Sequence, residues 1–280
     1  MNTGVVYIAS GNKYIEEARQ SAKTLKKQMP EMKTTLISSK NITDPNFEQV
    51  IVIDNPQYSL LDKVKYMADT PYDYTLFLDT DTFIYEPVYE LFILLEKFDI
   101  AVAHEQTRIS YSVPEIPNSF PEMNTGVILF KKSLQIKKLF QDWLNFYERD
   151  LKKIPKPKHD QPAFREAIYK NSENLRLMTL IPEYNCRIEK AVFIQSTVKI
   201  FHMHAKPERM NLPDLAAYIN QKNIIRVYVP GLGLVSTKRW KLRIHTRHLT
   251  IVLPMHLPRV LGWFSYRFQK SIKKLSPKFQ

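Results

Sequence analysis

In the segment Leu76-Phe77-Leu78-Asp79-Thr80-Asp81-Thr82-Phe83-Ile84, an apolar run ends on two aspartates. The residues from Thr75 to Leu78 have the length and composition of a buried strand. Side chains alternate along a strand, so we expect Asp79 and Asp81 on one face at its carboxyl end, where open α/β sheets bind ligands. Two adjacent carboxylates repel each other unless a cation lies between them, and their hard oxygens suit Mg²⁺ or Mn²⁺. An Asp-rich turn is the alternative, but the apolar run before it favours a metal site able to hold a diphosphate.

Composition and charge indicate a globular chain with a distinct C-terminal segment. The 280 residues suffice for one large α/β domain and an appendage, and the single cysteine, Cys186, excludes an internal disulfide and fits a reducing compartment. The chain starts on a strand-like run without the features of a signal peptide, and it has no uninterrupted apolar run of about 18 residues that would predict a spanning helix. Residues 215–280 contain 13 Lys or Arg and no Asp or Glu, so the net charge of +13 belongs to this segment.

Apolar patterns predict strands that alternate with helices, which is typical of a doubly wound, mostly parallel sheet with flanking helices, an α/β fold. A helix over 133–149 is expected to bury Leu134, Leu139, Trp143 and Phe146. The predicted strands are 4–9, 34–37, 50–53, 75–78, 99–103, 123–130 and 198–204, and the other predicted helices are 13–28, 58–68, 90–97 and one that begins near Gln161.

The turn after the first strand is a candidate nucleotide site. In doubly wound folds this turn commonly receives a nucleotide, helped by the N-terminus of the following helix. Ala9, Ser10 and Gly11 are small enough to let a base or ribose approach, and Tyr14 is placed to stack on it. The alternative is a simple connector, since the turn lacks a GxGxxG pattern.

Four further polar residues are candidates for the site. Asn124 leads into an apolar strand, and its amide suits a sugar hydroxyl. Asp160 opens a helix, where it is either catalytic or a helix cap. His202 and His204 lie two apart in a predicted strand and share a face, as metal ligands would, although single histidines are more often structural.

Four sequence blocks together resemble the GT-A glycosyltransferases, especially family 8. In the family's order they are LFLDTDTFI, MNTGVILF, HDQPAF and IFHMHAKP, and the resemblance covers roughly residues 4–210. It implies a GT-A catalytic domain over 1–214, followed by the basic, aromatic-rich segment 215–280. It also implies an enzyme that transfers a hexose-like sugar from a nucleotide-diphosphate sugar, with UDP as the family default, to a glycan or lipid-linked acceptor.

The resemblance also implies residue roles. Asp79, Asp81 and a histidine would bind Mn²⁺ or Mg²⁺ on the diphosphate. The usual family pattern is His-x-x-Gly-x-x-Lys-Pro, whereas this chain has His202-Met203-His204-Ala205-Lys206-Pro207, which leaves both histidines as candidates and slightly favours His202. Lys206 resembles the phosphate-binding lysine. The remaining donor-site residues are Lys63 and Thr80 toward the nucleotide, Asn124 and Asp160 at the sugar, and Gln161 beneath the anomeric carbon.

A family 8-like enzyme would retain the anomeric configuration, because the acceptor would attack on the face that the diphosphate leaves. No dedicated base is then needed, and Asp160 is the only candidate base for an inverting reaction. The enzymatic alternative is a haloacid-dehalogenase-like phosphatase, which also places Asp-x-Asp after an apolar strand. Its motif normally lies in the first strand and has a threonine where this chain has Phe83.

The basic segment supports a non-enzymatic alternative, a module that binds nucleic acid or a membrane surface. No nucleic-acid-binding motif is present and the body is neutral, so no nucleic acid is expected as a partner. Within 256–280, apolar residues fall on one helical face, aromatic residues border it and basic residues lie opposite, a pattern typical of a helix in a membrane interface. Packing on the body or on a second subunit is the alternative. The prediction is a cytoplasmic protein attached peripherally to an anionic inner membrane face.

Overall fold

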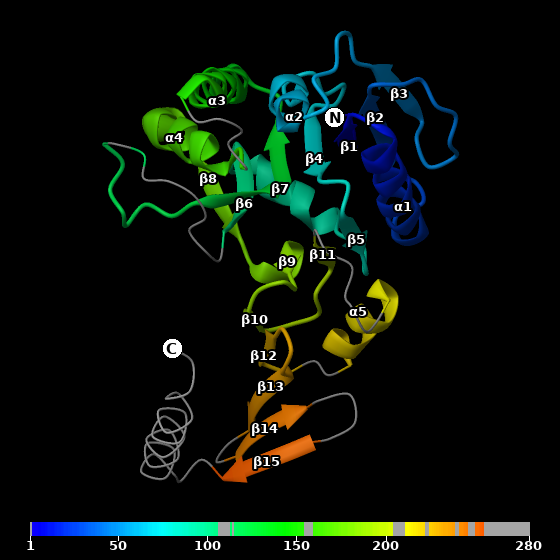
Figure 1. The fold of residues 1–280 in the computed structure, drawn as a ribbon, viewed down its shortest axis with the longest axis vertical. Helices are drawn as coiled ribbons and strands as arrows, with labels where there is room; N and C mark the ends of the chain where they lie inside the picture. Colours follow the sequence, from blue (N-terminus) through cyan, green and yellow to red (C-terminus); the bar gives the residue numbers. More distant parts are fainter. Residues whose placement is uncertain are drawn as a thin grey trace, which may run out of the picture.

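The computed structural model describes residues 2–105, 113, 115–153, 159–203, 211–221, 224–238, 241–245 and 250–254. Strands and helices alternate over its first two thirds, and the C-terminal strands extend away from the main sheet (Figure 1). The elements are β1 (Thr3–Ala9), α1 (Asn12–Gln28), β2 (Lys33–Ser38), β3 (Gln49–Val52), α2 (Leu60–Tyr66), β4 (Tyr74–Leu78), β5 (Thr82–Ile84), η1 (Tyr89–Glu96), β6 (Ile100–His104), β7 (Met123–Lys131), α3 (Leu134–Lys153), α4 (Gln161–Asn171), η2 (Ser172–Asn174), β8 (Leu177–Leu180), η3 (Pro182–Tyr184), β9 (Cys186–Arg187), β10 (Val192–Ile194), β11 (Ile200–His202), α5 (Leu212–Asn220), β12 (Arg226–Val229), β13 (Gly233–Lys238), β14 (Lys241–His245) and β15 (Thr250–Pro254).

The central sheet has seven strands in the order β3-β2-β1-β4-β7-β6-β8. Only β7 runs against its neighbours, β4 and β6, so the predicted class of a mostly parallel sheet with flanking helices is confirmed. The register of β4 with β7 runs from Tyr74 opposite Lys131 to Leu78 opposite Val127. The carboxyl end of β4 therefore lies beside the start of β7, where the backbone N–H of Asp79 donates to the carbonyl of Gly126 at 2.8 Å.

Alternation along β1 divides the core into two layers. Val5 and Tyr7 pack on the side that α1 and η1 cover, and Val6 and Ile8 pack on the side of α2, α3 and α4. The helix predicted over 13–28 is α1, and it buries Ile15, Ala18, Ala22 and Leu25 along one face. Leu134 was wrongly assigned to the core, because it is the first residue of α3 and is 82% exposed.

Other element boundaries differ modestly from the sequence patterns. The helix expected over 90–97 is a 3₁₀ helix, η1. Of the residues expected to form a strand over 198–204, Ile200–His202 form the strand β11. The helix α3 continues to Lys153, beyond the predicted end at residue 149, and residues 154–158 lie outside the described part.

Two smaller sheets complete the described chain. One holds β5, β11 and β9, and the other has the order β10-β12-β13-β14-β15. The predicted division after residue 214 falls inside α5, whose Leu215 and Ile219 pack with Val192 of β10 and Tyr228 of β12 in a third core. Residues 255–280 lie outside the described chain, and with them the predicted amphipathic helix. None of the described helices is both long and apolar enough to cross a membrane.

Candidate functional site

Three side chains with metal-binding atoms converge at the carboxyl end of β4. Asp79 and Asp81 follow the strand directly, while His202 ends β11. The ladder between β5 and β11 sets Thr82 opposite His202, and the N–H of Met203 donates to the carbonyl of Asp81 at 3.2 Å. Backbone pairing thus brings the histidine to the aspartates, as the sequence predicted for His202.

The geometry of these three side chains fits a divalent cation. Nε2 of His202 lies 3.4 Å from Oδ1 of Asp81 and 3.7 Å from Oδ2 of Asp79, and one ligand atom from each residue falls within 4.8 Å of the others. Two neighbouring ligands of an octahedral ion, each about 2.1 Å from it, lie about 3 Å apart. Two carboxylate oxygens and one imidazole nitrogen are a ligand set suited to Mn²⁺, and also acceptable to Mg²⁺.

A buried lysine links the metal cluster to the start of α4. Nζ of Lys63 lies 3.2 Å from Oδ1 of Asp79 and 3.1 Å from Oδ2 of Asp160, and it donates to Oγ1 of Thr125 at 3.1 Å. Burial acts to lower the pKa of Lys63, but the carboxylates of Asp160 and Asp79 outweigh it and hold the pKa above its usual value. The lysine is therefore a fixed positive charge beside the metal cluster.

Opposing effects act on the pKa of the Asp79 carboxylate. Burial raises its pKa, and the negative charges of Asp81 and Asp160 act in the same direction, against the effect of Lys63 and His202. Crowded carboxylates of this kind favour a bound cation, because a cation removes their mutual repulsion.

Asp160 occupies the N-cap position of α4 without capping it. Its side chain makes no hydrogen bond to the first turn of the helix. It instead accepts from Oγ1 of Thr125 at 3.0 Å and pairs with Lys63. The helix-cap interpretation is therefore wrong for this side chain, which points toward the metal cluster.

Asn124 and Gln161 meet on a buried carboxylate, that of Glu105. Nδ2 of Asn124 donates to Oε2 of Glu105 at 2.8 Å, and Nε2 of Gln161 donates to the same oxygen at 3.1 Å. Nη1 of Arg187 donates to it at 2.7 Å. The amide nitrogen of Gln161 is also 3.3 Å from Oε1 of Glu122, so both amides predicted to contact the sugar are held by an acidic cluster behind them.

A cavity of about 350 Å³ opens beside the metal cluster and includes the turn between β1 and α1. Gly11 adjoins it with a φ of 93°, in the left-handed region that favours glycine, and a Cβ there would lie 3.7 Å from Tyr58. The structure thus brings the predicted nucleotide turn and the aspartates to one cavity. The predicted residues that line it are Ala9, Ser10, Tyr14, Lys63, Asp79, Thr80 and Asp81.

Two tyrosines flank this cavity with exposed rings. Tyr14 is 48% exposed and Tyr58 is 60% exposed, and Tyr58 has a φ of 53°, an uncommon backbone conformation for a bulky residue. Tyr58 was not predicted as a site residue, because its only signal in the sequence is its place at the start of the helical segment predicted over 58–68. Two exposed aromatic faces beside a cavity are suited to stack on a planar base.

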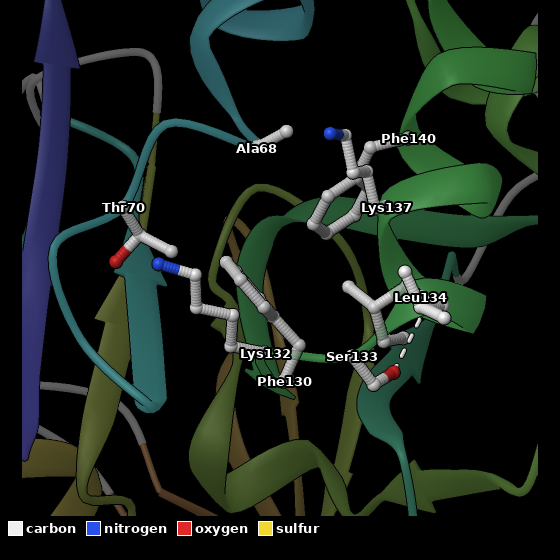
Figure 2. Close-up of a pocket in the computed structure, with 9 residues that line it drawn as sticks. Ala68, Thr70, Phe130, Lys132, Ser133, Leu134, Lys137 and Phe140 are labelled. Carbon is white, nitrogen blue, oxygen red and sulfur yellow. Dashed lines mark hydrogen bonds between the residues drawn. The ribbon is translucent and has the colours of Figure 1, made fainter.

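A second cavity, of about 320 Å³, lies at the other end of the sheet (Figure 2). It is lined by apolar side chains such as Phe130 and Phe140, with Lys132 and Lys137 at its rim. Lys131, next to Lys132, pairs with Tyr74 at the start of β4, away from Asp79 at the end of that strand. This cavity is separate from the metal cluster.

Two predicted residues, His204 and Lys206, lie outside the described chain. Several residues of the site gave no signal in the sequence, because they reach it only through the fold. They are Glu105, Glu122, Thr125, Asn185 and Arg187.

Solved structures of two glycosyltransferases share the backbone architecture of this chain. No protein-family model matches the chain, and no curated protein matches it. The glycosyltransferase GlyE of Streptococcus pneumoniae TIGR4 superposes with a TM-score of 0.53 at 16% identity, over 75% of this chain and 57% of GlyE. The galactosyltransferase LgtC, solved with donor and acceptor sugar analogs, gives a TM-score of 0.51 at 10% identity, over 73% of this chain and 88% of LgtC. This chain has the GT-A fold.

In the GT-A fold of this chain, the Asp-x-Asp pair lies at the carboxyl end of a central strand, as the sequence resemblance implied. The chain spans 57% of the length of GlyE. At these identities the likeness is one of backbone architecture, so the chemistry of the site follows from its own side chains.

Proposed function

We propose that this chain is a metal-dependent glycosyltransferase that uses a nucleotide-diphosphate sugar, with UDP as the expected nucleotide. The observation that carries the proposal is the convergence of Asp79, Asp81 and His202 beside a cavity that includes the turn after β1. A nucleotide in this cavity would place its diphosphate at the aspartates and its base between the exposed rings of Tyr14 and Tyr58.

In this proposal the residues around the metal cluster bind and orient the donor. A bound Mn²⁺ or Mg²⁺ would supply positive charge to the leaving diphosphate. Lys63 provides a second, permanent positive charge near the same group, and its ion pairs hold Asp79 and Asp160 in place. Lys206, just beyond the described strand β11, would add a third charge. Asn124, Asp160 and Gln161 would line the sugar side of the site.

We propose that transfer retains the anomeric configuration. The bond between the anomeric carbon and the diphosphate oxygen breaks, the acceptor oxygen bonds on the same face, and its proton passes to the leaving phosphate oxygen. In this reaction Gln161 would lie beneath the anomeric carbon, and its side chain is oriented by Glu105, which accepts a hydrogen bond from its amide nitrogen at 3.1 Å. Asp160 would be the base of an inverting reaction, but its pairing with Lys63 and Thr125 occupies both carboxylate oxygens.

A donor screen tests the proposal. Purified protein with Mn²⁺ is offered a panel of nucleotide sugars, and release of the nucleotide diphosphate is measured with and without EDTA. We expect hydrolysis of one donor class that EDTA abolishes. The variant Asp81→Asn should bind Mn²⁺ poorly and turn over slowly while keeping its fold. Unchanged turnover in EDTA would contradict the proposal, and so would release of inorganic phosphate from simple phosphate esters with no reaction of any nucleotide sugar.

The acceptor is proposed to be a glycan or lipid-linked molecule at the inner, cytoplasmic face of a membrane. Two observations support this: the segment 215–280 has no acidic residue, and large apolar side chains are exposed near its first strands. Phe193 of β10, Ile225 before β12 and Leu232 after it are each at least half exposed. Clustered basic residues add about 1 kcal/mol each to binding of an anionic lipid surface.

Flotation with anionic liposomes at low and high salt tests this attachment. The full chain is compared with a chain that ends at Pro254, which keeps β12 to β15 and the third core intact. We expect the full chain to float at low salt and the shorter chain to float less. Equal flotation, or none, would contradict the role given to residues 255–280.

A further inference from the structure

We propose that Asn185 is a positioning residue that sets the tautomer of His202, placing the proton on Nδ1 and the lone pair of Nε2 toward Asp79 and Asp81. The inference rests on the proposed function only in treating these three residues as metal ligands. It follows from a chain of hydrogen bonds that begins at a backbone amide, where the identity of the donor is fixed.

The first link is the N–H of Gly126, which donates to Oδ1 of Asn124 at 2.9 Å. A backbone amide can only donate, so the atom of Asn124 facing it must be its oxygen. The nitrogen of the same side chain then faces Glu105, whose Oε2 accepts at 2.8 Å. An ionised carboxylate only accepts, so both ends fix the same orientation of Asn124.

The second link is Asn185. It lies 2.8 Å from Oδ1 of Asn124, which acts as an acceptor, so the atom of Asn185 at this contact must be its nitrogen, Nδ2. Rotating the amide of Asn185 by half a turn would set two acceptor oxygens against each other. The oxygen of Asn185 therefore faces the imidazole of His202, with Oδ1 2.9 Å from Nδ1.

The third link is the imidazole. Because Oδ1 of Asn185 only accepts, Nδ1 of His202 must carry the proton, and in the neutral ring Nε2 then carries the lone pair. The Nε2 atom is the one 3.4 Å from Asp81 and 3.7 Å from Asp79. Metal-binding histidines generally donate their other N–H in this way, which fixes the ring and its tautomer.

The buried carboxylate of Glu105 fixes the end of the hydrogen-bond chain that lies farthest from His202. The side chain of Glu105 is fully buried and pairs with Arg187, and Asn124, Asn185 and His202 are each no more than 3% exposed. Freeing Asn124 to rotate would leave a buried carboxylate short of a donor, which is costly. The tautomer of His202 is therefore set by a buried chain of hydrogen bonds that runs from Glu105 through Asn124 to Asn185, whose Oδ1 bonds the imidazole ring.

Nitrogen-15 NMR of the metal-free protein tests the tautomer directly. Long-range ¹H–¹⁵N spectra of histidine-labelled protein are recorded at a pH where the imidazoles are neutral, and His202→Gln assigns the signal. We expect His202 to carry its proton on Nδ1. A signal showing the proton on Nε2 would overturn the inference, whatever sugar donor the protein uses.

Variants at Asn185 test its role. Asn185→Leu removes the acceptor, whereas Asn185→Asp keeps an acceptor for Nδ1–H and loses only the donor to Oδ1 of Asn124, which should lower its stability. We expect the leucine variant to lose the Nδ1–H preference and to bind Mn²⁺ about 10–100-fold more weakly, and the aspartate variant to keep the tautomer. Mn²⁺ binding is measured by electron paramagnetic resonance without any nucleotide.

Asn220→Leu is the matched control, because Asn220 bonds both backbone groups of Val198 outside this chain of contacts. It should lower the thermal stability without changing Mn²⁺ affinity. Wild-type Mn²⁺ affinity in folded Asn185→Leu, or loss of the tautomer in Asn185→Asp, would overturn the role of Asn185. Should the leucine variant not fold, the aspartate variant and the wild-type spectrum still decide. If the donor screen finds no reaction but the NMR and Mn²⁺-binding results are as expected, the proposed transferase activity is contradicted and the positioning role of Asn185 is not.

Discussion

Gly126→Ala is expected to disable the metal cluster through one added methyl group. A Cβ built on Gly126 lies 2.0 Å from Cε1 of His202 and 2.7 Å from its Nε2. Carbon atoms pack best at about 3.5–4.0 Å, so the ring would have to move by about 1.5 Å. The ring has little room to do so, since it is 1% exposed and bonded to Asn185. We expect a loss of about 1–3 kcal/mol in the free energy of unfolding from overpacking. We also expect Mn²⁺ binding to weaken by at least the 10–100-fold typical of a disturbed metal-ligand orientation.

The chain offers a matched control in Gly4→Ala. A Cβ at Gly4 would lie 2.3 Å from the ring of Tyr72, a similar clash remote from the metal cluster. Both variants are compared by chemical unfolding and by Mn²⁺ titration. Gly4→Ala should be destabilised with unchanged Mn²⁺ affinity, whereas Gly126→Ala should lose both. If Gly126→Ala bound Mn²⁺ like the wild type, the close approach of its backbone to His202 would not govern the cluster and the reasoning would be refuted.

Three further outcomes are expected. Lys63→Met leaves the buried carboxylate of Asp160 and the partly buried one of Asp79 without their cation, so the free energy of unfolding should fall by about 3 kcal/mol, and adding Asp160→Asn should restore part of it. The pKa of Asp99, which burial alone would raise, is held below its usual value by Arg176 and Lys131, so its stabilising effect is present above about pH 4 and is lost as the pH falls. In urea unfolding, the wild type should therefore lose stability between pH 5 and 3 more steeply than Asp99→Asn, and parallel curves would contradict this. Finally, NMR of the product glycoside should show the anomeric configuration of the donor, and inversion would point to Asp160 as a base.

The sequence predicted the parts of the fold that depend on local pattern. The helix α1 and the strand that ends at Leu78, just before Asp79, follow from spacing and composition, and both are found. The direction of β7 did not follow, because an apolar strand reads alike in either direction. Leu134 was wrongly assigned to the core because the periodicity of a helix does not show whether its first turn packs against another element.

The site was predictable only where a motif is carried on one element. Asp79, Asp81 and His202 gave signals of that kind, and the structure brings them together. Glu105 and Asn185 gave none, since a single acid after a strand and a single asparagine between a 3₁₀ helix and a short strand are common. Their importance arises from pairings across the fold, which no local pattern records.

The pairing of β5 with β11 has a consequence for how the chain folds. His202 reaches the aspartates only once a short strand from late in the chain has docked on one that directly follows Asp81. Forming such a non-local contact carries a loop-closure cost, so the three ligands should be assembled only in the nearly complete structure. A cation that needs all three would then bind the native chain and not its unfolded forms, and its concentration would shift the unfolding midpoint. The rate at which Mn²⁺ is bound during refolding would therefore report the rate at which β11 docks on β5.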